Sequence, residues 1–240
     1  MKAMILAAGR GTRLLPLTST CPKPMVPIAG RPLLEYSIRL LAQHGFDELA
    51  LNLHHLPQTI RDYFGDGRKW DVKLTYSYEE DLLGTAGAVR NLADFFDQRF
   101  LVYYGDHLSN ADLTSLWKFH ERADALATIG LIWKEDPSAS GIVELDASQR
   151  VQRFIEKPGA NQTFANYLVN AGIYVLEPEI MQWIQTPPPR DFGYDVFPAL
   201  LAAQRPVYGH RLEGQLLSTD TLERFRHTQQ QVADRQFVLP

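Results

Sequence analysis

A short loop near the start of the chain combines small residues with two basic ones. Its sequence is Leu6-Ala7-Ala8-Gly9-Arg10-Gly11-Thr12-Arg13-Leu14. Glycine lets the backbone approach a ligand closely, and consecutive backbone N–H groups can surround an anion. The guanidinium of Arg13 can bind two phosphate oxygens at once, and Lys23, farther along the same loop, adds a compact positive charge. These residue types predict a site for phosphate groups.

Two common nucleotide-binding motifs do not fit this loop. The dinucleotide motif G-x-G-x-x-G has its third glycine where this chain has Leu14, and the P-loop sequence G-K-S or G-K-T occurs nowhere in the chain. These differences disfavour an NAD-type dehydrogenase. A glycine pair after a strand is as often a structural turn as a ligand site. The phosphate interpretation therefore depends on Arg13 and Lys23.

The charge of the chain excludes several classes of partner. Its 240 residues include 24 Lys and Arg against 28 Asp and Glu, which gives a net charge of −4 at neutral pH. The sequence therefore lacks a basic footprint for nucleic acid and a Lys/Arg block for an anionic membrane. No apolar stretch approaches the roughly 18 residues of a membrane span. We expect neither nucleic acid nor a membrane as a partner.

The single cysteine and the N-terminal residues indicate a cytoplasmic protein. Cys21 has no second cysteine with which to form an internal disulfide, and this fits a reducing compartment. The apolar run Ala3–Ala8 is too short for a signal peptide and is followed at once by basic residues. We therefore predict a cytoplasmic location.

The first half of the chain alternates strand-like apolar runs with amphipathic segments of helix length. Strands are predicted at Ala3–Ala8, Leu49–Leu53, Val72–Tyr78 and Phe100–Tyr104, and helices at Pro32–His44, Gln58–Phe64, Thr85–Phe96 and Leu113–Ala123. This alternation is typical of an α/β fold with a mainly parallel sheet covered by helices on both faces. Ligands of such sheets bind where the strands end at their carboxyl edges, and the glycine-rich loop follows the first strand.

The second half contains more strands and fewer helices. Strands are predicted at Ala127–Trp133, Ile142–Leu145, Val151–Ile155, Ala171–Leu176 and Val207–Leu212, and helices at Tyr194–Ala203 and Thr221–Ala233. We expect antiparallel strands to extend one edge of the same sheet. Because no repeat or linker interrupts the chain, residues 1–240 are predicted to form a single Rossmann-like domain with a mixed sheet.

The glycine-rich loop, together with Pro16-Leu17-Thr18 and Pro22-Lys23-Pro24-Met25, resembles the signature of the sugar-1-phosphate nucleotidyltransferases. This family includes mannose-1-phosphate guanylyltransferases and glucose-1-phosphate thymidylyltransferases. Further segments are similar to the family's pattern: Tyr78-Glu79-Glu80, Leu83-Gly84-Thr85-Ala86-Gly87, Gly105-Asp106, Gly141-Ile142-Val143, Phe154-Ile155-Glu156-Lys157-Pro158, Asn170-Ala171-Gly172-Ile173-Tyr174 and Asp195-Val196-Phe197-Pro198. The resemblance extends from residue 1 to about residue 225.

The resemblance implies a nucleoside triphosphate and a sugar 1-phosphate as substrates and Mg²⁺ as cofactor. Arg13, Lys23, Asp106 and Lys157 would be catalytic, with Asp106 holding the metal and Lys157 the sugar phosphate. The nucleotide would contact Leu6, Ala8, Gly9, Gly11, Thr12, Arg13, Glu80, Gly84 and Thr85. The sugar phosphate would contact Gly141, Glu156, Lys157, Asn170 and Gly172. The implied reaction is an in-line displacement at the α-phosphorus that releases pyrophosphate.

The chain departs from the family pattern near its C-terminus. Aligning Thr221 and Glu223 with that pattern places Ser218 where a second metal-binding aspartate is expected. Asp220 is a candidate replacement after a local shift. Alternatively, Asp106 holds the metal with phosphates and water, or catalysis is lost. If the missing carboxylate matters, Ser218→Asp should raise activity or metal affinity.

Several functions therefore remain open. The segment around Glu80 and Gly84 looks most like the guanylyltransferase branch, so mannose 1-phosphate with GTP is the first substrate hypothesis. The alternatives are dTTP with glucose 1-phosphate, UTP with an amino-sugar 1-phosphate, GTP with heptose 1-phosphate, and a non-catalytic binder of sugar nucleotides. The sequence has no hexapeptide repeat, so no C-terminal β-helix is expected. The polar C-terminal helix permits a homo-oligomer.

Overall fold

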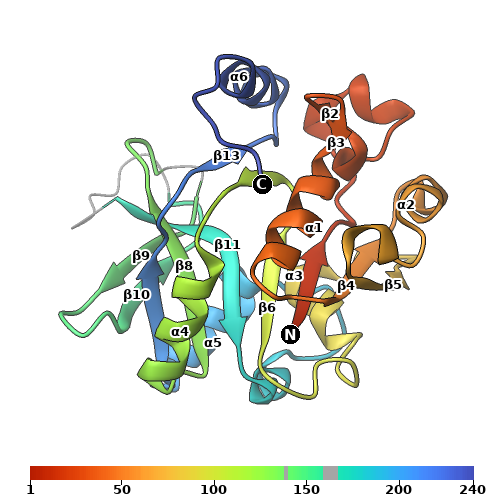
Figure 1. Cartoon of the computed structure of the whole chain (residues 1–240). Coiled ribbons are helices and arrows are strands. Elements are labelled where there is room, and N and C mark those ends of the chain that lie inside the picture. Colours follow the sequence, from red (N-terminus) through yellow and green to blue (C-terminus); the bar gives the residue numbers. More distant parts are fainter. Residues whose placement is uncertain (138–139, 159–166) are drawn as a thin grey trace. The chain divides into compact units, whose positions relative to one another are not determined.

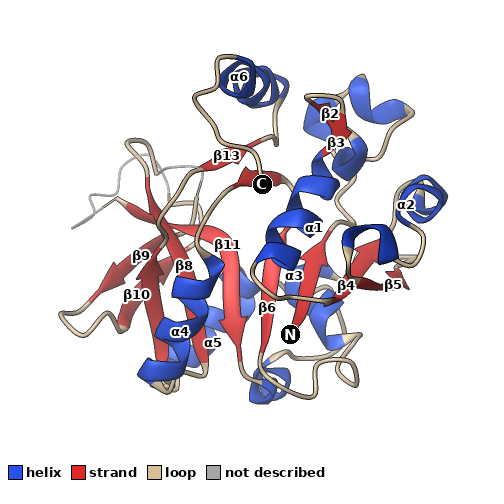
Figure 2. Cartoon of the chain, viewed as in Figure 1, coloured by secondary structure: helices blue, strands red, loops and turns tan. Residues whose placement is uncertain are grey.

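The computed structural model describes residues 1–137, 140–158 and 167–240, and these residues form two compact units. The first unit comprises Met1–Leu82, Tyr103–Asp112 and Glu213–Pro240, and the second comprises Leu83–Val102 and Leu113–Leu212. Figures 1 and 2 show their helices and strands. No helix in these described ranges is long and apolar enough to cross a membrane. A single domain over residues 1–240 stays a prediction.

Parallel strands form the centre of the first unit. β1 (Lys2–Leu6) pairs with β4 (Glu48–Leu53), which in turn pairs with β5 (Lys73–Tyr78). The connections are the helices α1 (Leu33–Gln43) and α2 (Pro57–Phe64), followed by the short helix η4 (Arg68–Trp70). Because such crossovers bury a strand on both faces, these strands read as apolar runs. The predicted elements are confirmed here to within two residues.

The long loop between β1 and α1 contains more regular structure than the sequence suggested. It forms three short 3₁₀ helices and a two-stranded ribbon: η1 (Thr12–Leu14), η2 (Leu17–Ser19), η3 (Lys23–Met25), β2 (Pro27–Ile28) and β3 (Arg31–Pro32). Leu14, Val26 and Ile28 of this loop are buried in one apolar cluster with Phe225 and Phe237. The cluster therefore anchors this loop against the C-terminal part of the chain.

The C-terminal part of the first unit pairs with the segment that follows β6 (Phe100–Tyr104). The boundary between the two units falls within β6. β13 (Leu216–Ser218) pairs antiparallel with β7 (His107–Ser109), and Ser218 lies opposite His107. The helix α6 (Leu222–Ala233) follows, capped by the side chain of Thr221. Neither three-residue strand was predicted, because such short segments carry no periodicity of their own.

The second unit contains a mixed, mostly antiparallel group of strands. β9 (Ile142–Leu145) pairs with β10 (Val151–Ile155) and with β11 (Leu168–Leu176), and β11 pairs with β8 (Ala127–Trp133). All these pairs are antiparallel, whereas β12 (Val207–Arg211) runs parallel to β8. The expected antiparallel strands are thus confirmed. β11 begins three residues before the predicted Ala171.

Helices cover both faces of these strands. His120 of α4 (Leu113–Ala123) bonds to Thr128 of β8, whereas Phe197 of α5 (Phe197–Ala202) packs against Tyr174 of β11. Tyr174 lies opposite Ile129 in the β11–β8 pairing, one residue from Thr128. Because side chains alternate between the faces of a strand, α4 and α5 lie on opposite faces, as Figure 1 shows. This confirms the α/β fold with a mixed sheet.

Two predicted helices have different bounds. α3 covers only Gly84–Arg90, so the predicted end at Phe96 is wrong. After Arg90 the backbone amides of Leu92, Ala93 and Phe95 donate to the carbonyl three residues back. Phe96 stacks on Phe100. The helix predicted from Tyr194 begins as a π-turn, η6 (Phe192–Val196), before α5. The segment η5 (Pro178–Trp183) is a 3₁₀ helix that the sequence did not indicate.

Candidate active site

The glycine-rich loop is shaped by a glycine in the left-handed conformation. Gly11 has φ 65°, and its carbonyl accepts hydrogen bonds from the Leu14 amide at 2.9 Å and from the Thr18 hydroxyl at 2.8 Å. A Cβ on Gly11 would lie 2.9 Å from the Cβ of Lys23. Only glycine therefore lets the loop fold back closely enough to place Lys23 beneath it.

Lys23 forms an ion pair with Asp106 in this first unit. Its Nζ lies 2.9 Å from Oδ2 of Asp106, and Lys23 is only 8% exposed. Asp106 follows Gly105, whose amide donates to the Leu6 carbonyl at 3.0 Å, so the residues after β6 are tied to the end of β1. Burial favours the neutral carboxyl, but the charges of His107 and Lys23 outweigh it and lower the pKa of Asp106.

The carboxylate of Asp106 has an oxygen suited to a cation. Its Oδ1 is buried and accepts no hydrogen bond from the residues that the structure describes, although His107 Nε2 lies 3.3 Å away. Mg²⁺ usually binds through one or two carboxylates and completes its ligands with substrate phosphates and water. Within the described part of the chain, no group of three or more His, Cys, Asp and Glu could hold a metal ion. Asp106 is therefore a candidate protein ligand for Mg²⁺.

Arg13 forms the second ion pair of the first unit. Its Nη1 lies 2.7 Å from Oδ2 of Asp220. The other oxygen of Asp220 accepts hydrogen bonds from the Ser218 hydroxyl at 2.8 Å and from Nη1 of Arg224 at 3.0 Å. Burial again favours the neutral carboxyl, but these hydrogen bonds and the charges of Arg224 and Arg13 lower the pKa of Asp220. Asp220 as a metal ligand stays a prediction.

A buried polar network lies at the end of β1, and the sequence analysis missed it. The amide of Asn52 donates to Oε1 of Glu79 at 2.9 Å, and its carbonyl oxygen accepts from the Ala7 amide at 2.8 Å. Glu79 is 2% exposed, whereas the predicted Glu80 is exposed. An asparagine inside the apolar strand β4 was the only signal, because buried polar groups need partners.

The predicted nucleotide residues Gly84 and Thr85 lie in the second unit. Gly84 has φ 79°, and a Cβ there would overlap the carbonyl of Arg190. The Thr85 hydroxyl donates to Oδ2 of Asp191 at 2.7 Å and accepts from the Phe192 amide at 3.0 Å. The start of α3 is therefore fixed to residues 190–192.

Glu156 is held between two glycines of the second unit. A Cβ on Gly141 would lie 2.5 Å from Oε2 of Glu156, and one on Gly193 would lie 2.7 Å from the same oxygen. Burial raises the pKa of Glu156, and the Asp191 charge adds to the rise although Lys157 opposes it. A carboxylate between these two glycines can accept hydrogen bonds from sugar hydroxyls.

Lys157 follows Glu156 with a strained backbone. Its φ is 45°, which is unusual for a residue other than glycine. The side chain is 59% exposed, with Nζ 4.0 Å from Oε1 of Glu156 and 5.8 Å from the centre of the Tyr194 ring. Such strain concentrates at functional sites, and here it accompanies an accessible ammonium group.

Asn170 and Gly172 occupy an irregular part of β11. The Asn170 amide donates to the Gly141 carbonyl at 2.8 Å, and the Gly172 amide donates to the Asn170 side chain at 2.9 Å. Gly172 has φ 70°, and the β11–β8 register shifts between Asn170 and Tyr174. This bulge links three of the predicted sugar-phosphate residues, Gly141, Asn170 and Gly172.

The structure thus joins the predicted residues into two groups. In the first unit Arg13, Lys23, Asp106 and Asp220 form two ion pairs, beside the loop residues Leu6, Ala8, Gly9, Gly11 and Thr12. In the second unit Glu156, Lys157, Gly141, Asn170 and Gly172 cluster, and Gly84 and Thr85 contact residues 190–192.

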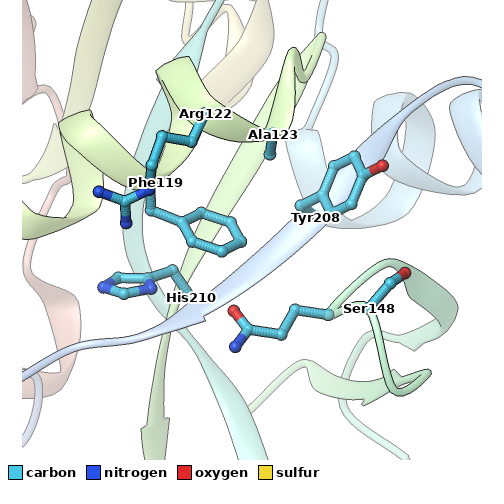
Figure 3. Close-up of a pocket in the computed structure, with 7 residues that line it drawn as sticks. Phe119, Arg122, Ala123, Ser148, Tyr208 and His210 are labelled. Carbon is cyan, nitrogen blue, oxygen red and sulfur yellow. The ribbon is translucent and has the colours of Figure 1, made fainter.

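Two cavities are lined by other residues. One, of about 550 Å³ in the second unit, is lined by Phe119, Arg122, Ala123, Ser148, Gln149, Tyr208 and His210, and Figure 3 shows the rings of Phe119, Tyr208 and His210 around it. The other, of about 430 Å³ in the first unit, lies between residues 16–27 and α6. Neither is lined by a residue that the sequence analysis placed in the site.

Comparison with protein families identifies the chain. The model of the nucleotidyl transferase family matches residues 2–227. The chain belongs to this family. It is 39% identical over 227 residues to the UTP–glucose-1-phosphate uridylyltransferase of Synechocystis, and 37% identical over 213 residues to the mannose-1-phosphate guanylyltransferase of Mycobacterium tuberculosis. These matches cover 89% and 87% of the chain and 58% of each relative, so the chain spans just under three fifths of their length.

Solved structures share the fold of this nucleotidyl transferase family member. A UDP-glucose pyrophosphorylase bound to UDP-glucose has a TM-score of 0.84 at 19% identity and covers 98% of both chains. HddC from Yersinia pseudotuberculosis has a TM-score of 0.80 at 24% identity, covering 96% of this chain and 99% of that one. These similarities confirm the α/β fold expected from the sequence.

Proposed function

We propose that the protein transfers a nucleotidyl group from a nucleoside triphosphate to a sugar 1-phosphate. The products are a nucleoside-diphosphate sugar and pyrophosphate. The observation that carries this proposal is the pairing of Lys23 with Asp106 beneath the glycine-rich loop, with Arg13 in the same loop. Membership of the nucleotidyl transferase family supports it.

The first unit supplies charge neutralisation. An oxygen of the sugar phosphate attacks the α-phosphorus, and the bond from that phosphorus to the bridging oxygen of pyrophosphate breaks. Phosphoryl transfer of this kind depends on positioning and on stabilisation of charge rather than on a protein nucleophile. Arg13 and Lys23 carry the positive charges for this purpose. Asp106 would hold Mg²⁺, which neutralises phosphate charge when it is bound.

The second unit supplies the groups for the sugar phosphate. Lys157 offers an exposed ammonium group for the phosphate. The desolvated carboxylate of Glu156 accepts hydrogen bonds from the hydroxyl groups of the sugar. Asn170 and the turn at Gly172 bring further polar groups to the same cluster. We assign Gly141 the role of leaving space for Glu156, because a side chain there would collide with the carboxylate.

We assign the nucleotide to the loop of the first unit. Leu6, Ala8, Gly9, Gly11 and Thr12 would provide backbone contacts to base and phosphates, with Glu80 near the base. A nucleotide role for Gly84 and Thr85 of the second unit stays a prediction. Asn52 and Glu79 fix the Ala7 amide and so the course of the loop.

Two substrate pairs have the best support. GTP with mannose 1-phosphate follows from the segment around Glu80 and Gly84 and from relatives such as the Mycobacterium tuberculosis guanylyltransferase. UTP with glucose 1-phosphate is favoured by the 39% identity to the Synechocystis uridylyltransferase. We propose a cytoplasmic enzyme, and a homo-oligomer stays a prediction.

The deciding experiment measures pyrophosphate release from GTP, UTP, dTTP, CTP and ATP. Each is combined with mannose, glucose, heptose and amino-sugar 1-phosphates, with and without Mg²⁺. Metal-dependent release from one pair, strongly reduced in Lys23→Met and retained in the exposed-lysine variant Lys73→Met, is the expected result. Nucleotide-sugar binding without any turnover would instead support a non-catalytic binder.

A further inference from the structure

Among the described residues, both carboxylate oxygens of Asp220 accept hydrogen bonds, from two arginines and one hydroxyl group. Arg13 takes one oxygen at 2.7 Å, while Ser218 and Arg224 take the other at 2.8 and 3.0 Å. The Asp220 side chain is 11% exposed, whereas that of Arg13 is 67% exposed. A largely buried anion thus holds an arginine that still faces solvent.

The backbone around Asp220 is fixed on both sides. Thr219 is fully buried, and both its amide and its hydroxyl donate to the Asp106 carbonyl, at 3.2 and 2.9 Å. The Thr228 hydroxyl donates to the Ser218 carbonyl, and Thr221 caps α6. The backbone at Asp220 is therefore held in place by hydrogen bonds on both sides. Its segment also hydrogen-bonds to Asp106, the aspartate that pairs with Lys23.

Apolar packing holds the segments that carry Arg13 and Asp220 close together. Leu14, next to Arg13, is fully buried in the cluster that contains Phe225, next to Arg224. Leu217 and Leu222, on either side of Asp220, pack against the same cluster. The loop and the start of α6 are thus held together without the ion pair.

Stability does not account for the ion pair. Because the Arg13 guanidinium is mostly exposed, water screens the pairing and it adds little to stability. The local charge also remains favourable for phosphate, since Arg13 and Arg224 give two positive charges against the one negative charge of Asp220. The arrangement restricts where the guanidinium lies while leaving it able to bind an anion.

We propose that Asp220 is a positioning residue that holds the Arg13 guanidinium for the α-phosphate, with Ser218 and Arg224 fixing the carboxylate. This inference rests on the proposed function, because it assigns Asp220 a part in that reaction. It differs from a metal-ligand role, which would leave the carboxylate oxygens to Mg²⁺. It also differs from simple competition, in which Asp220 only blocks Arg13.

The direct test follows the mobility of the Arg13 side chain without any turnover. Protein labelled with ¹⁵N-arginine gives side-chain Nε–Hε signals, and the Arg13 signal is identified by its loss in Arg13→Lys. We expect a rigid Arg13 in the wild type and an order parameter below about 0.6 in Asp220→Asn. Asp66→Asn is the matched control, because Asp66 pairs with Arg68 at 3.1 Å on an exposed surface of the same unit.

Kinetics then separate the three roles of Asp220. Positioning predicts that Asp220→Asn lowers kcat about tenfold without raising the KM for the nucleotide, because the charge becomes more positive while geometry is lost. In an Arg13→Lys background the same change should have little further effect. Arg224→Gln should lower kcat less, by about threefold, since Arg13 keeps its direct bond.

Other results for mobility, kcat, KM or Mg²⁺ requirement would each contradict the proposal. An Arg13 signal that stays rigid in Asp220→Asn contradicts positioning whether or not the enzyme turns over. An unchanged kcat with a lower KM indicates competition, and a higher Mg²⁺ requirement indicates a metal ligand. If wild-type protein shows no turnover with any substrate pair, the proposed function fails, while the mobility measurement still reports whether Asp220 holds Arg13.

Discussion

The two units position their charged groups by different means. In the first unit, Arg13 pairs with Asp220, 207 residues away, and Lys23 pairs with Asp106, 83 residues away. In the second unit, Glu156 and Lys157 are neighbours whose closest charged atoms are 4.0 Å apart. Glycines and a left-handed backbone at Lys157 set their geometry. One unit relies on ion pairs between distant segments, and the other on local backbone shape.

This difference predicts different responses to substitution. An ion pair couples two groups, so removing one partner leaves the other charge uncompensated and changes both. A side chain held by backbone shape can be removed with less effect on its neighbours. Substitutions at the ion pairs of the first unit should therefore impair several properties at once, and those at Glu156 and Lys157 should affect the sugar phosphate alone.

The largest effect is expected for Lys23→Met. It removes a buried positive charge and leaves Asp106 without its partner, so kcat should fall about 10²- to 10³-fold. The pKa of Asp106 should rise towards its ordinary value, because the Lys23 charge and hydrogen bond lower it. Steady-state kinetics against Lys73→Met, an exposed lysine of the same unit, measure the effect. A loss confined to KM would contradict the role in neutralising developing charge.

Lys157→Met should have a smaller and more selective effect. Loss of one charged hydrogen bond raises the KM for the sugar 1-phosphate about 10-fold or more. The KM for the nucleotide should stay unchanged, because Lys157 touches only Glu156 and Tyr194 among the charged and aromatic groups described. The control is Lys118→Met, an exposed lysine on α4. Equal changes in both KM values would erase the contrast between the units.

The pH dependence should also separate the two units. Glu156 has a raised pKa, so on acidification it becomes protonated at a pH above the ordinary glutamate pKa of about 4.3. The carboxylate that accepts hydrogen bonds from the sugar hydroxyls is then lost. The KM for the sugar 1-phosphate should then rise up to about tenfold per pH unit below that pKa. Asp106 and Asp220 have lowered pKa values and remain ionised over the same range.

Glu156→Gln provides the control for this pH profile. Its amide cannot titrate, so the part of the profile due to Glu156 should disappear, while titration of the sugar phosphate itself remains. A profile that is identical in wild type and variant would show that the raised pKa of Glu156 plays no part in sugar binding.

Most of the fold could be predicted from hydrophobic patterns. Leu113–Ala123 and Ala127–Trp133 have the predicted bounds, because long periodic segments bury one face or both. The helix predicted to reach Phe96 ended at Arg90, since the packing of Phe96 on Phe100 overrides local helix propensity. β7 and β13 exist only through their mutual pairing, which no local pattern reveals.

The site shows the same division. Arg13, Lys23 and Asp106 could be named from residue type and family resemblance, because their chemistry is visible in the sequence. The partner of Arg13 could not, since Asp220 reaches it only through the packing of α6 against the loop. The burial of Asn52 and Glu79 also depends on tertiary structure, so their network was missed.

The smallest effect is expected for Ser218→Asp, and its sign tests the charge balance of the first unit. Arg13, Lys23 and Arg224 face Asp106 and Asp220 there, and a third carboxylate would cancel the remaining positive charge. Metal affinity should rise about 2- to 5-fold, because Mg²⁺ prefers charged oxygens, while nucleotide affinity falls. Titration with Mn²⁺ by electron paramagnetic resonance measures the metal without turnover, and Ser218→Asn controls for size. If metal affinity stays constant in Ser218→Asp, the carboxylate absent from this position does not limit metal binding, and the ion pairs of the first unit serve the phosphates alone.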